Sequence, residues 1–410
     1  MEVITLRQQE VTRYRVIKGT IERKISNSEA ARLLGISRRQ VIRIKNRVRR
    51  VDLKGIIHGN RGKRPKLAIR NETKEMILSL YQNRYNGFNV LHFGEFLKDA
   101  HGIEVSRETL RKLLLDAGLR TKVKSPPRHR SRRARMPRAG LLVQMDSSEH
   151  QWLDDSTLWL IATIDDATGE VPYALIVDSD STENNMSVIK RMVEKKGIPA
   201  ALYTDGASHF ATQRHYSYRV NLKYDYAPTQ IERALKELGV ELIIAGSPQA
   251  KGRIERLFGT LQDRLLKELR LHGISTIKKA NNYLHRRFLP KFNKKFSIAP
   301  KDPESAWRVL PKELNLDSIF SIKEQRTVRA DNTISYKNRI FQILPNKYRI
   351  SFAKAQVMVE KRLDESIHIK YKDQYLDHKE IRSGKSYVKK STSITFNNLI
   401  TGDIFTLHQG

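Results

Sequence analysis

The chain has 410 residues, and its 77 Lys and Arg against 44 Asp and Glu leave a formal charge of +33. This length suggests roughly three modules, and the charge indicates a polyanionic partner, most simply nucleic acid, with a ribosomal or chaperone-like basic surface as the alternative. The absence of cysteine excludes disulfides, thiolate metal sites and cysteine nucleophiles. No stretch approaches about 18 apolar residues and no signal peptide is evident, so we expect an intracellular protein without a membrane anchor.

The charge is distributed unevenly along the chain. Residues 1–140 carry 35 Lys and Arg against 12 Asp and Glu, whereas residues 141–200 carry 4 against 11. A basic arm beside an acidic block fits a protein that grips phosphate with one region and concentrates carboxylates for a metal cation in another.

The first predicted unit is a helix-turn-helix DNA-binding domain over residues 1–57. A short apolar face ends at Gly35, Ser37 is a suitable N-cap for a second helix, and Val41, Ile44 and Val48 repeat at helical spacing. The second helix would enter a major groove; an ordinary helical hairpin with a basic solvent face is the alternative. The candidate DNA contacts on this helix are Arg38, Arg39, Arg43 and Arg47.

A second helical, helix-turn-helix-like DNA-binding domain is predicted over residues 67–120. Helical patterns cover 72–84 and 90–100, and Ser106 and Gly118 would begin and end a third helix. A purely structural trihelical domain is the alternative. Candidate DNA contacts in the polar connector before this domain and on its third helix are Arg61, Lys63, Arg64, Arg107 and Arg111.

Residues 121–139 are predicted to be a basic linker. The segment KSPPRHRSRRARMPR, at 124–138, has seven Lys and Arg, no acid and three prolines that oppose regular structure. A segment of this composition suits the DNA backbone, and its candidate contacts are Arg130, Arg132 and Arg133.

Residues 140–310 are predicted to form an α/β core. Short apolar runs at 141–146, 157–165 and 171–177 are followed by a helix at about 182–196, a run at 201–205, a helical pattern near 228–238, a run at 240–245 and a long helix from about Gly252. Three strands followed by alternating helices and strands predict a mixed sheet with helices on both faces. This is the order expected of a ribonuclease-H-like core.

The C-terminal region is predicted to be all-β. Alternating apolar and polar residues with intervening turn signals suggest a small β-barrel over 315–376, followed by a polar tail over 377–410.

Three carboxylates occupy comparable positions in the predicted core. Asp146 and Asp205 each end an apolar run, and Glu255 lies in the first turn of the long helix, beside its buried stripe. Strand ends and helix starts meet at the rim of an open α/β sheet, where ligands bind. A turn or a helix cap would explain any one of them alone, as hairpin turns explain Asp165, Asp166, Asp178 and Asp180. Three hard oxygen donors at one rim would suit magnesium or manganese.

The segments around these carboxylates resemble a known family. QMDSSEHQW, YTDGASHF and GSPQAKGRIERLFGTLQDRL look like the three signatures of the integrase core in bacterial insertion-sequence transposases and retroviral integrases. The grouping that it resembles most is the ISNCY-type transposases, and the preceding helix-turn-helix arm and following β domain match that arrangement. The 49 residues between Asp205 and Glu255 exceed the spacing usual in retroviral members.

The resemblance implies a site and a reaction. Asp146, Asp205 and Glu255 would be an Asp-Asp-Glu triad that holds two Mg²⁺ or Mn²⁺ ions, with Lys251, Arg253 and Gln262 near DNA. Metal-activated water would nick the terminal repeats of an insertion sequence, and the freed 3′-hydroxyls would join target DNA by transesterification. We expect a homodimer or higher homo-oligomer on DNA, in the bacterial cytoplasm at the nucleoid.

Two alternatives remain open at this point. One is a metal-dependent nuclease of the same fold that cuts without joining, and the other is a non-catalytic DNA-binding regulator. His209, close to Asp205, could contact a phosphate or serve as a structural histidine.

Overall fold

The structure, a computed structural model, describes residues 5–61, 69–121, 134–153, 156–205, 208–210, 228–245, 252–347 and 349–381. The chain divides into two compact units, Met1–Gln82 and Asn83–Gly410. Across the described ranges, no helix is both long enough and apolar enough to cross a membrane.

The N-terminal unit is helical and contains the predicted helix-turn-helix. Its elements are α1 (Gln8–Ile21), α2 (Asn27–Leu34), α3 (Arg38–Val51), the short η1 (Asp52–Ile56) and the start of α4 (Asn71–Asn83). Ser37 Oγ accepts a hydrogen bond from Gln40 N at 3.2 Å, so it caps α3 as expected. Val41, Ile44 and Val48 are buried against α1 and α2. The apolar pattern does not predict α1, because Ile17 and Thr20 alone are buried among its residues.

The second unit begins with two more of the predicted helices, α5 (Val90–His101) and α6 (Arg107–Asp116). Ser106 Oγ accepts from Thr109 N at 3.1 Å and caps α6 as predicted. The chain leaves α6 through Gly118, whose φ of 69° is a left-handed conformation that glycine adopts without strain.

A mixed five-stranded sheet follows, as the order of apolar runs predicts. The strands are β1 (Leu142–Leu153), β2 (Ser156–Asp165), β3 (Ala174–Val177), β4 (Ala201–Thr204) and β5 (Glu241–Ile244), in the order β3-β2-β1-β4-β5. The pairings β1–β2 and β2–β3 are antiparallel, whereas β1–β4 and β4–β5 are parallel.

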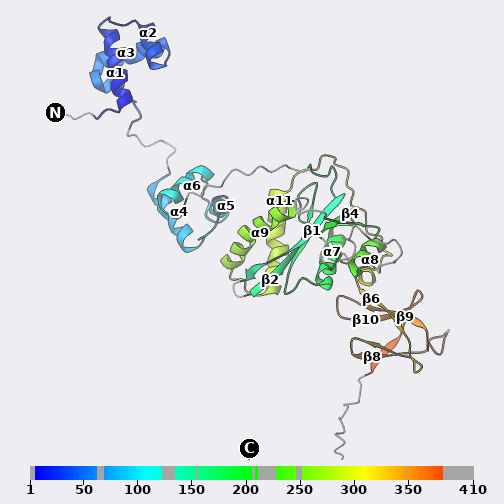
Figure 1. The fold of residues 1–410 in the computed structure, drawn as a ribbon. Coiled ribbons are helices and arrows are strands. Elements are labelled where there is room, and N and C mark those ends of the chain that lie inside the picture. The colour runs from blue at the N-terminus through cyan, green and yellow to red at the C-terminus, as the bar shows by residue number, and fades with distance from the viewer. Residues whose placement is uncertain are drawn as a thin grey trace, which may run out of the picture. The chain divides into compact units, whose positions relative to one another are not determined.

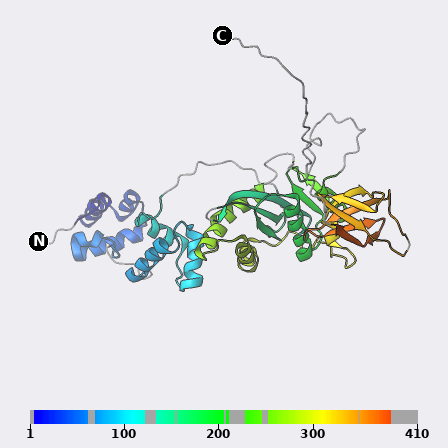
Figure 2. The same cartoon turned by 90° about the horizontal axis from the view of Figure 1, so that it is seen from below.

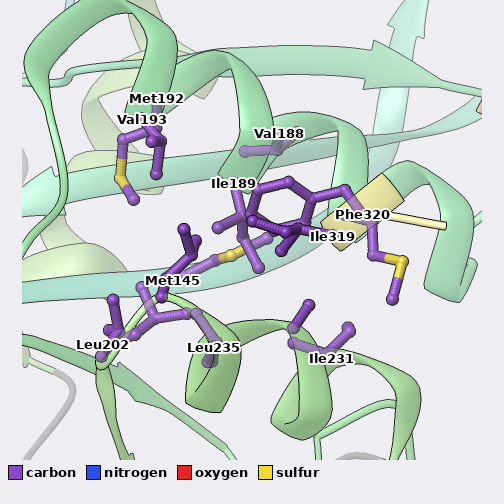
Figure 3. Close-up of a cluster of buried hydrophobic side chains, with 14 of the residues drawn as sticks. Met145, Val188, Ile189, Met192, Val193, Leu202, Ile231, Leu235, Ile319 and Phe320 are labelled. Atoms are coloured by element: carbon purple, nitrogen blue, oxygen red, sulfur yellow. The ribbon is translucent and has the colours of Figure 1, made fainter. Parts of the chain in front are cut away.

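Helices cover both faces of this sheet (Figure 1). One face packs against α7 (Thr182–Lys196) and α8 (Gln230–Glu237), where Figure 3 shows Met145 and Leu202 of the sheet meeting Ile189, Ile231 and Phe320. The other face packs against α9 (Gly252–Leu271), α10 (Ile277–Tyr283), the π-helical turn η4 (Leu284–Phe288) and α11 (Leu289–Phe296). Because side chains alternate along a strand, Val143 and Met145 of β1 face α7 and leave the even-numbered residues on the α9 side.

The C-terminal region is all-β after the one-turn helix α12 (Leu316–Ile319), as Figure 2 shows in orange. Strands β6 (Ile322–Thr327), β9 (Gln356–Lys361), β10 (Ile367–Tyr371) and β11 (Gln374–Leu376) form one sheet, and β7 (Thr333–Tyr336), β8 (Arg339–Ile343) and β12 (His378–Ile381) form another. The two sheets share one apolar core. The strand pairings among the described residues do not close the predicted barrel. Residue alternation predicts which face of a strand is buried but not which strands pair, so it does not distinguish a barrel from two packed sheets.

The β region also extends further than the sequence predicts. Residues from 377 onward are expected to be a polar tail, yet His378–Ile381 pair with β8 as β12. These residues are mostly exposed, so this edge strand carries no alternating apolar pattern that would reveal it.

Candidate functional site

Asp146 is the fifth of the twelve residues of β1, not its last as the sequence predicts, and Asp205 directly follows the neighbouring parallel strand β4. The observed register pairs Gln144 of β1 with Tyr203 of β4. Asp146 and Asp205 each stand two residues beyond this last pair, and continuing the same register would set them opposite one another. Both are half-buried. Neighbouring strands are about 4.8 Å apart, and paired residues of parallel strands point to the same face. Continued in this way, the register makes Asp146 and Asp205 neighbours in the sheet.

Two polar contacts align α9 with β1. Near its N-terminus, Arg253 Nε donates to Asp166 Oδ1 at 2.8 Å, and Gln144 Nε2 donates to the same oxygen at 2.8 Å. Further along, Gln262 Nε2 donates to Ser148 Oγ at 3.2 Å. The two contacts are nine residue steps apart on the helix, about 13.5 Å, and four residue steps apart on the strand, about 13 Å. Helix α9 therefore runs parallel to β1, on the face to which Gln144 and Ser148 point.

This alignment brings Glu255 to the level of the two aspartates. Glu255 is two residues beyond Arg253, about 3 Å further along the helix, which corresponds to about one residue of β1 beyond Gln144. Its side chain is exposed, whereas its neighbour Ile254 is fully buried against the sheet. Asp146, which lies between Gln144 and Ser148 on the even-numbered face, points to the same side of the sheet.

Across the described ranges, no three His, Asp or Glu side chains stand close enough together to hold a metal ion. Residues 206–207, 211–227 and 246–251 lie outside the described ranges. They include most of the extra length between Asp205 and Glu255 and the start of the segment GSPQAKGRIERLFGTLQDRL, so the structure does not describe these parts of the resemblance.

The neighbouring carboxylates Asp165 and Asp166 have structural roles. Asp166 is fully buried and accepts from Met136 N at 2.8 Å in addition to the two side chains described above. Asp165 accepts from Gly140 N at 2.6 Å and from the backbone of Thr168 at 2.9 Å. Together they tie the entry to β1, the turn after β2 and the start of α9.

His209 lies beside Asp180, on the opposite side of β1 from Asp146. Its Nε2 is 4.0 Å from Asp180 Oδ2, and that oxygen accepts from Ser147 Oγ at 2.7 Å. Asn185 Nδ2 donates to the other Asp180 oxygen at 2.6 Å. Ser147 follows Asp146 directly but points to the α7 side of the sheet. The contacts of Asp180 with Ser147, Asn185 and His209 therefore lie on the face of β1 opposite Asp146.

The four arginines predicted to contact DNA from α3 are all exposed. Arg38, Arg39, Arg43 and Arg47 line the surface of this helix opposite its buried stripe. Lys45 behaves differently, because its Nζ donates to Thr20 O at 2.6 Å within the unit. The exposed row is therefore available to a partner.

The other predicted DNA contacts have varied surroundings. Arg107 is exposed, whereas Arg111 donates twice to the Glu108 carboxylate at 2.8 and 2.7 Å. Arg61 pairs with Glu10 at 2.8 Å. Six candidates lie outside the described ranges: Lys63, Arg64, Arg130, Arg132, Arg133 and Lys251.

Helix α5 docks on α9 through polar side chains, a contact that the sequence does not reveal. His92 Nε2 lies 2.8 Å from Glu268 Oε1, and both residues are buried. Burial alone would raise the pKa of Glu268, but hydrogen bonds from His92 and from Tyr283 bring it below its usual value of 4.5. One turn further along α5, Glu95 accepts twice from Arg264, at 3.0 and 2.9 Å.

Comparisons with known proteins match a helix-turn-helix family in the N-terminal part of the chain and two transposases over most of its length. The winged helix-turn-helix family matches residues 21–75. The chain is 31% identical over 384 residues to the putative transposase y4bF of Sinorhizobium fredii (strain NBRC 101917 / NGR234), which covers 92% of this chain and 82% of that protein. It is 30% identical over 420 residues to the transposase for insertion sequence IS1202 of Streptococcus pneumoniae, which covers 93% of this chain and 88% of that protein.

Solved structures of integrases are also similar to parts of the chain. The HTLV-2 integrase catalytic core domain in complex with magnesium is 15% identical, with a TM-score of 0.30, and the match covers 40% of this chain and 94% of that one. The simian T-cell lymphotropic virus intasome in complex with the PP2A regulatory subunit B56 gamma is 13% identical, with a TM-score of 0.32, and the match covers 70% and 95%.

Proposed function

This chain belongs to the transposase family that includes the IS1202 transposase, and we propose that it cuts the ends of an insertion sequence and joins them to target DNA. Its helix-turn-helix unit binds DNA, and the two ends of the element are recognised through their terminal repeats. Water attacks the phosphodiester at each end and frees a 3′-hydroxyl. That hydroxyl then attacks a target phosphodiester in a single transesterification, without a covalent protein intermediate.

The observation that carries the proposal is the alignment of three carboxylates. The register of β1 and β4, continued by two residues, would set Asp146 opposite Asp205, and the two contacts of α9 with the sheet support a position of Glu255 near their level. We assign these three residues as the catalytic triad. Their half-buried or exposed positions leave them open to the DNA backbone.

The donor chemistry of the triad fits a pair of hard divalent ions, Mg²⁺ or Mn²⁺. Carboxylate oxygens are the ligands that these ions prefer. Such a pair supplies the positive charge that makes water nucleophilic and stabilises the leaving oxygen. The chain's own contribution is to carry Asp146 on β1, Asp205 directly after β4 and Glu255 on a helix held against the sheet by two contacts, from which the three side chains would close around the ions.

The remaining parts of the chain have roles that follow from this reaction. We propose that 1–57 and 67–120 are DNA-binding domains, 121–139 a basic linker, 140–310 the catalytic core and 315–381 a small β domain that includes β12. Two ends must be joined in one event, so the active form is a homodimer or higher oligomer. The enzyme works at chromosomal DNA, in the bacterial cytoplasm at the nucleoid.

The test is strand transfer of a labelled, pre-cleaved element end into plasmid DNA with magnesium. Asp146→Asn, Asp205→Asn and Glu255→Gln remove one negative charge each and keep the side-chain shape. We expect all three variants to bind the end but to join none of it, and chelation of the metal to abolish joining by the wild type. The matched control is Asp178→Asn, an exposed aspartate after β3 that should retain wild-type joining.

The same assay separates the alternatives. Cutting without joining by the wild type would identify a nuclease, and tight binding without either reaction would identify a regulator. Joining that survives any one of the three triad substitutions would remove that residue from the assignment.

A further inference from the structure

A cavity of about 450 Å³ lies beside α9, on the side of the helix away from Glu255. Its lining includes the three arginines Arg135, Arg253 and Arg256. Apolar side chains of the sheet, of α9 and of α11, among them Phe292 and Phe296, form the rest of the wall. This volume lies in the range of cavities that hold ligands of nucleotide size.

The three guanidinium groups are held in place by different contacts. Arg135 donates through Nη1 to Ala167 O at 3.2 Å, and Arg253 pairs with the buried Asp166. Among the described residues, the guanidinium of Arg256 has no hydrogen-bond or carboxylate partner, and Arg256 is exposed on the first turns of α9. The cavity thus has two arginines fixed by the fold and one that is available to a ligand.

The three guanidinium groups bring more positive charge to this cavity than the two nearby carboxylates, Asp165 and Asp166, balance. Burial lowers the pKa of Arg135, and the nearby Arg253 and Arg256 lower it further, while Asp165 and Asp166 offset part of this effect. Like charges gathered around one cavity repel each other, and a phosphate would relieve that repulsion. Arginine is well suited to this because its planar group can donate two parallel hydrogen bonds to phosphate oxygens.

We propose that this cavity binds a phosphate of the DNA on which the enzyme acts, at a site separate from the carboxylate triad. The inference rests on the proposed function for its ligand class. Arg256 contacts the phosphate directly, and Arg135 and Arg253 supply the rest of the positive charge around it. Helix α9 thus presents Glu255 to the reacting phosphodiester on one side and Arg253 and Arg256 to a second phosphate on the other. The bound phosphate belongs either to duplex DNA or to an unpaired terminal nucleotide, whose base the apolar wall would accept.

The test uses two variants of the full-length chain. Arg256→Ala removes the available charge, and Thr260→Glu places a carboxylate in the cavity lining without removing any arginine. The control is Arg270→Ala, which removes an exposed arginine of the same helix outside the cavity. Binding of a fluorescent element end is measured by anisotropy as a function of salt, with thermal melting to verify that each variant is folded.

We expect both cavity variants to weaken binding by about tenfold at 0.1 M salt, the size of one charged hydrogen bond. The slope of log K against log salt should fall by about 0.9, the value for one lost phosphate contact, whereas Arg270→Ala should show a smaller change in both. A blunt end and an end with a single-stranded 5′ overhang are compared. An effect on both ends indicates a duplex phosphate, and an effect on the overhang alone indicates an unpaired nucleotide.

Wild-type slope and affinity in both cavity variants on both ends would overturn the proposal, as would an equal effect of Arg270→Ala. Strand transfer by the wild type, measured on the same DNA, distinguishes this result from failure of the proposed function. If the wild type does not join DNA, the proposed function is refuted. The salt dependence of DNA binding by the variants tests the cavity alone.

Discussion

Asp166 is the buried residue whose removal should do most damage to the candidate site. Its fully buried carboxylate accepts from Met136 N, Gln144 Nε2 and Arg253 Nε, each at 2.8 Å. Asp166→Ala leaves these three donors without their acceptor and leaves Arg253, whose side chain is 13% exposed, without its counter-charge. Removing one partner of a buried ion pair costs about 3–5 kcal/mol, a sizeable part of the 5–15 kcal/mol that stabilises a typical protein.

Urea unfolding followed by tryptophan fluorescence measures this cost. The chain has three tryptophans, at positions 152, 159 and 307, and all of them lie in the second unit. The fluorescence therefore reports on the core that contains Asp166. The control is Asp178→Ala, an exposed position where the cost should stay within about 0.5 kcal/mol.

The substitution should also reduce strand transfer under conditions in which the variant is still folded. Asp166 joins Gln144 of β1 to Arg253 of α9, so its loss frees the helix turn that carries Glu255. A loss of less than about 1 kcal/mol, or full joining activity in the folded variant, would show that this carboxylate does not fix α9 and would refute the reasoning.

Three further predictions concern other parts of the chain. The pKa of Glu268 is lowered in the folded state, so its pairing with His92 should stabilise the protein above pH 4.5 and lose that effect as the pH falls through the folded pKa. The difference in urea midpoint between wild type and Glu268→Gln should accordingly be present at pH 7 and shrink in acid; a constant difference would contradict this. Arg43→Ala and Arg47→Ala, at exposed positions of α3, should weaken DNA binding and leave the melting temperature of the chain unchanged, as anisotropy and calorimetry would test. Ser37→Ala removes the N-cap of α3 and should lower the free energy of unfolding of the N-terminal unit by about 1 kcal/mol, as urea unfolding followed by circular dichroism would measure. No change in stability would mean that the hydrogen bond from Gln40 N to Ser37 Oγ is dispensable.

Much of the candidate site could be predicted from local sequence. Asp205 ends an apolar run and directly follows β4, as the pattern predicts, whereas β1 continues beyond Asp146 to Leu153, so the end of that apolar run does not mark the end of its strand. Glu255 lies just outside an apolar stripe of helical period, so its exposure beside the sheet also follows from the pattern. The caps Ser37 and Ser106 were predictable for the same reason, because capping depends on residues three positions apart.

Other features could not be predicted because their signals are not local. Helix α1 buries too few residues to show a period, and β12 is an edge strand whose pairing with β8 decides its conformation. The contact of His92 with Glu268 joins residues 176 positions apart, and nothing in either neighbourhood marks them as partners. Arg135 and Arg256 likewise belong to two unremarkable basic stretches until the fold brings them to one cavity.

The sequence by itself determined the class of each region, the positions of most helices and strands, and the residues that were candidates for chemistry, since these depend on periodicity, capping and residue type. Only the tertiary structure decided which strand lies next to β1, the register that sets Asp146 level with Asp205, and the contacts that fix α9 beside them. These depend on hydrogen bonds and packing between segments far apart in the chain, whose free energies are set by the whole fold and not by any window of the sequence.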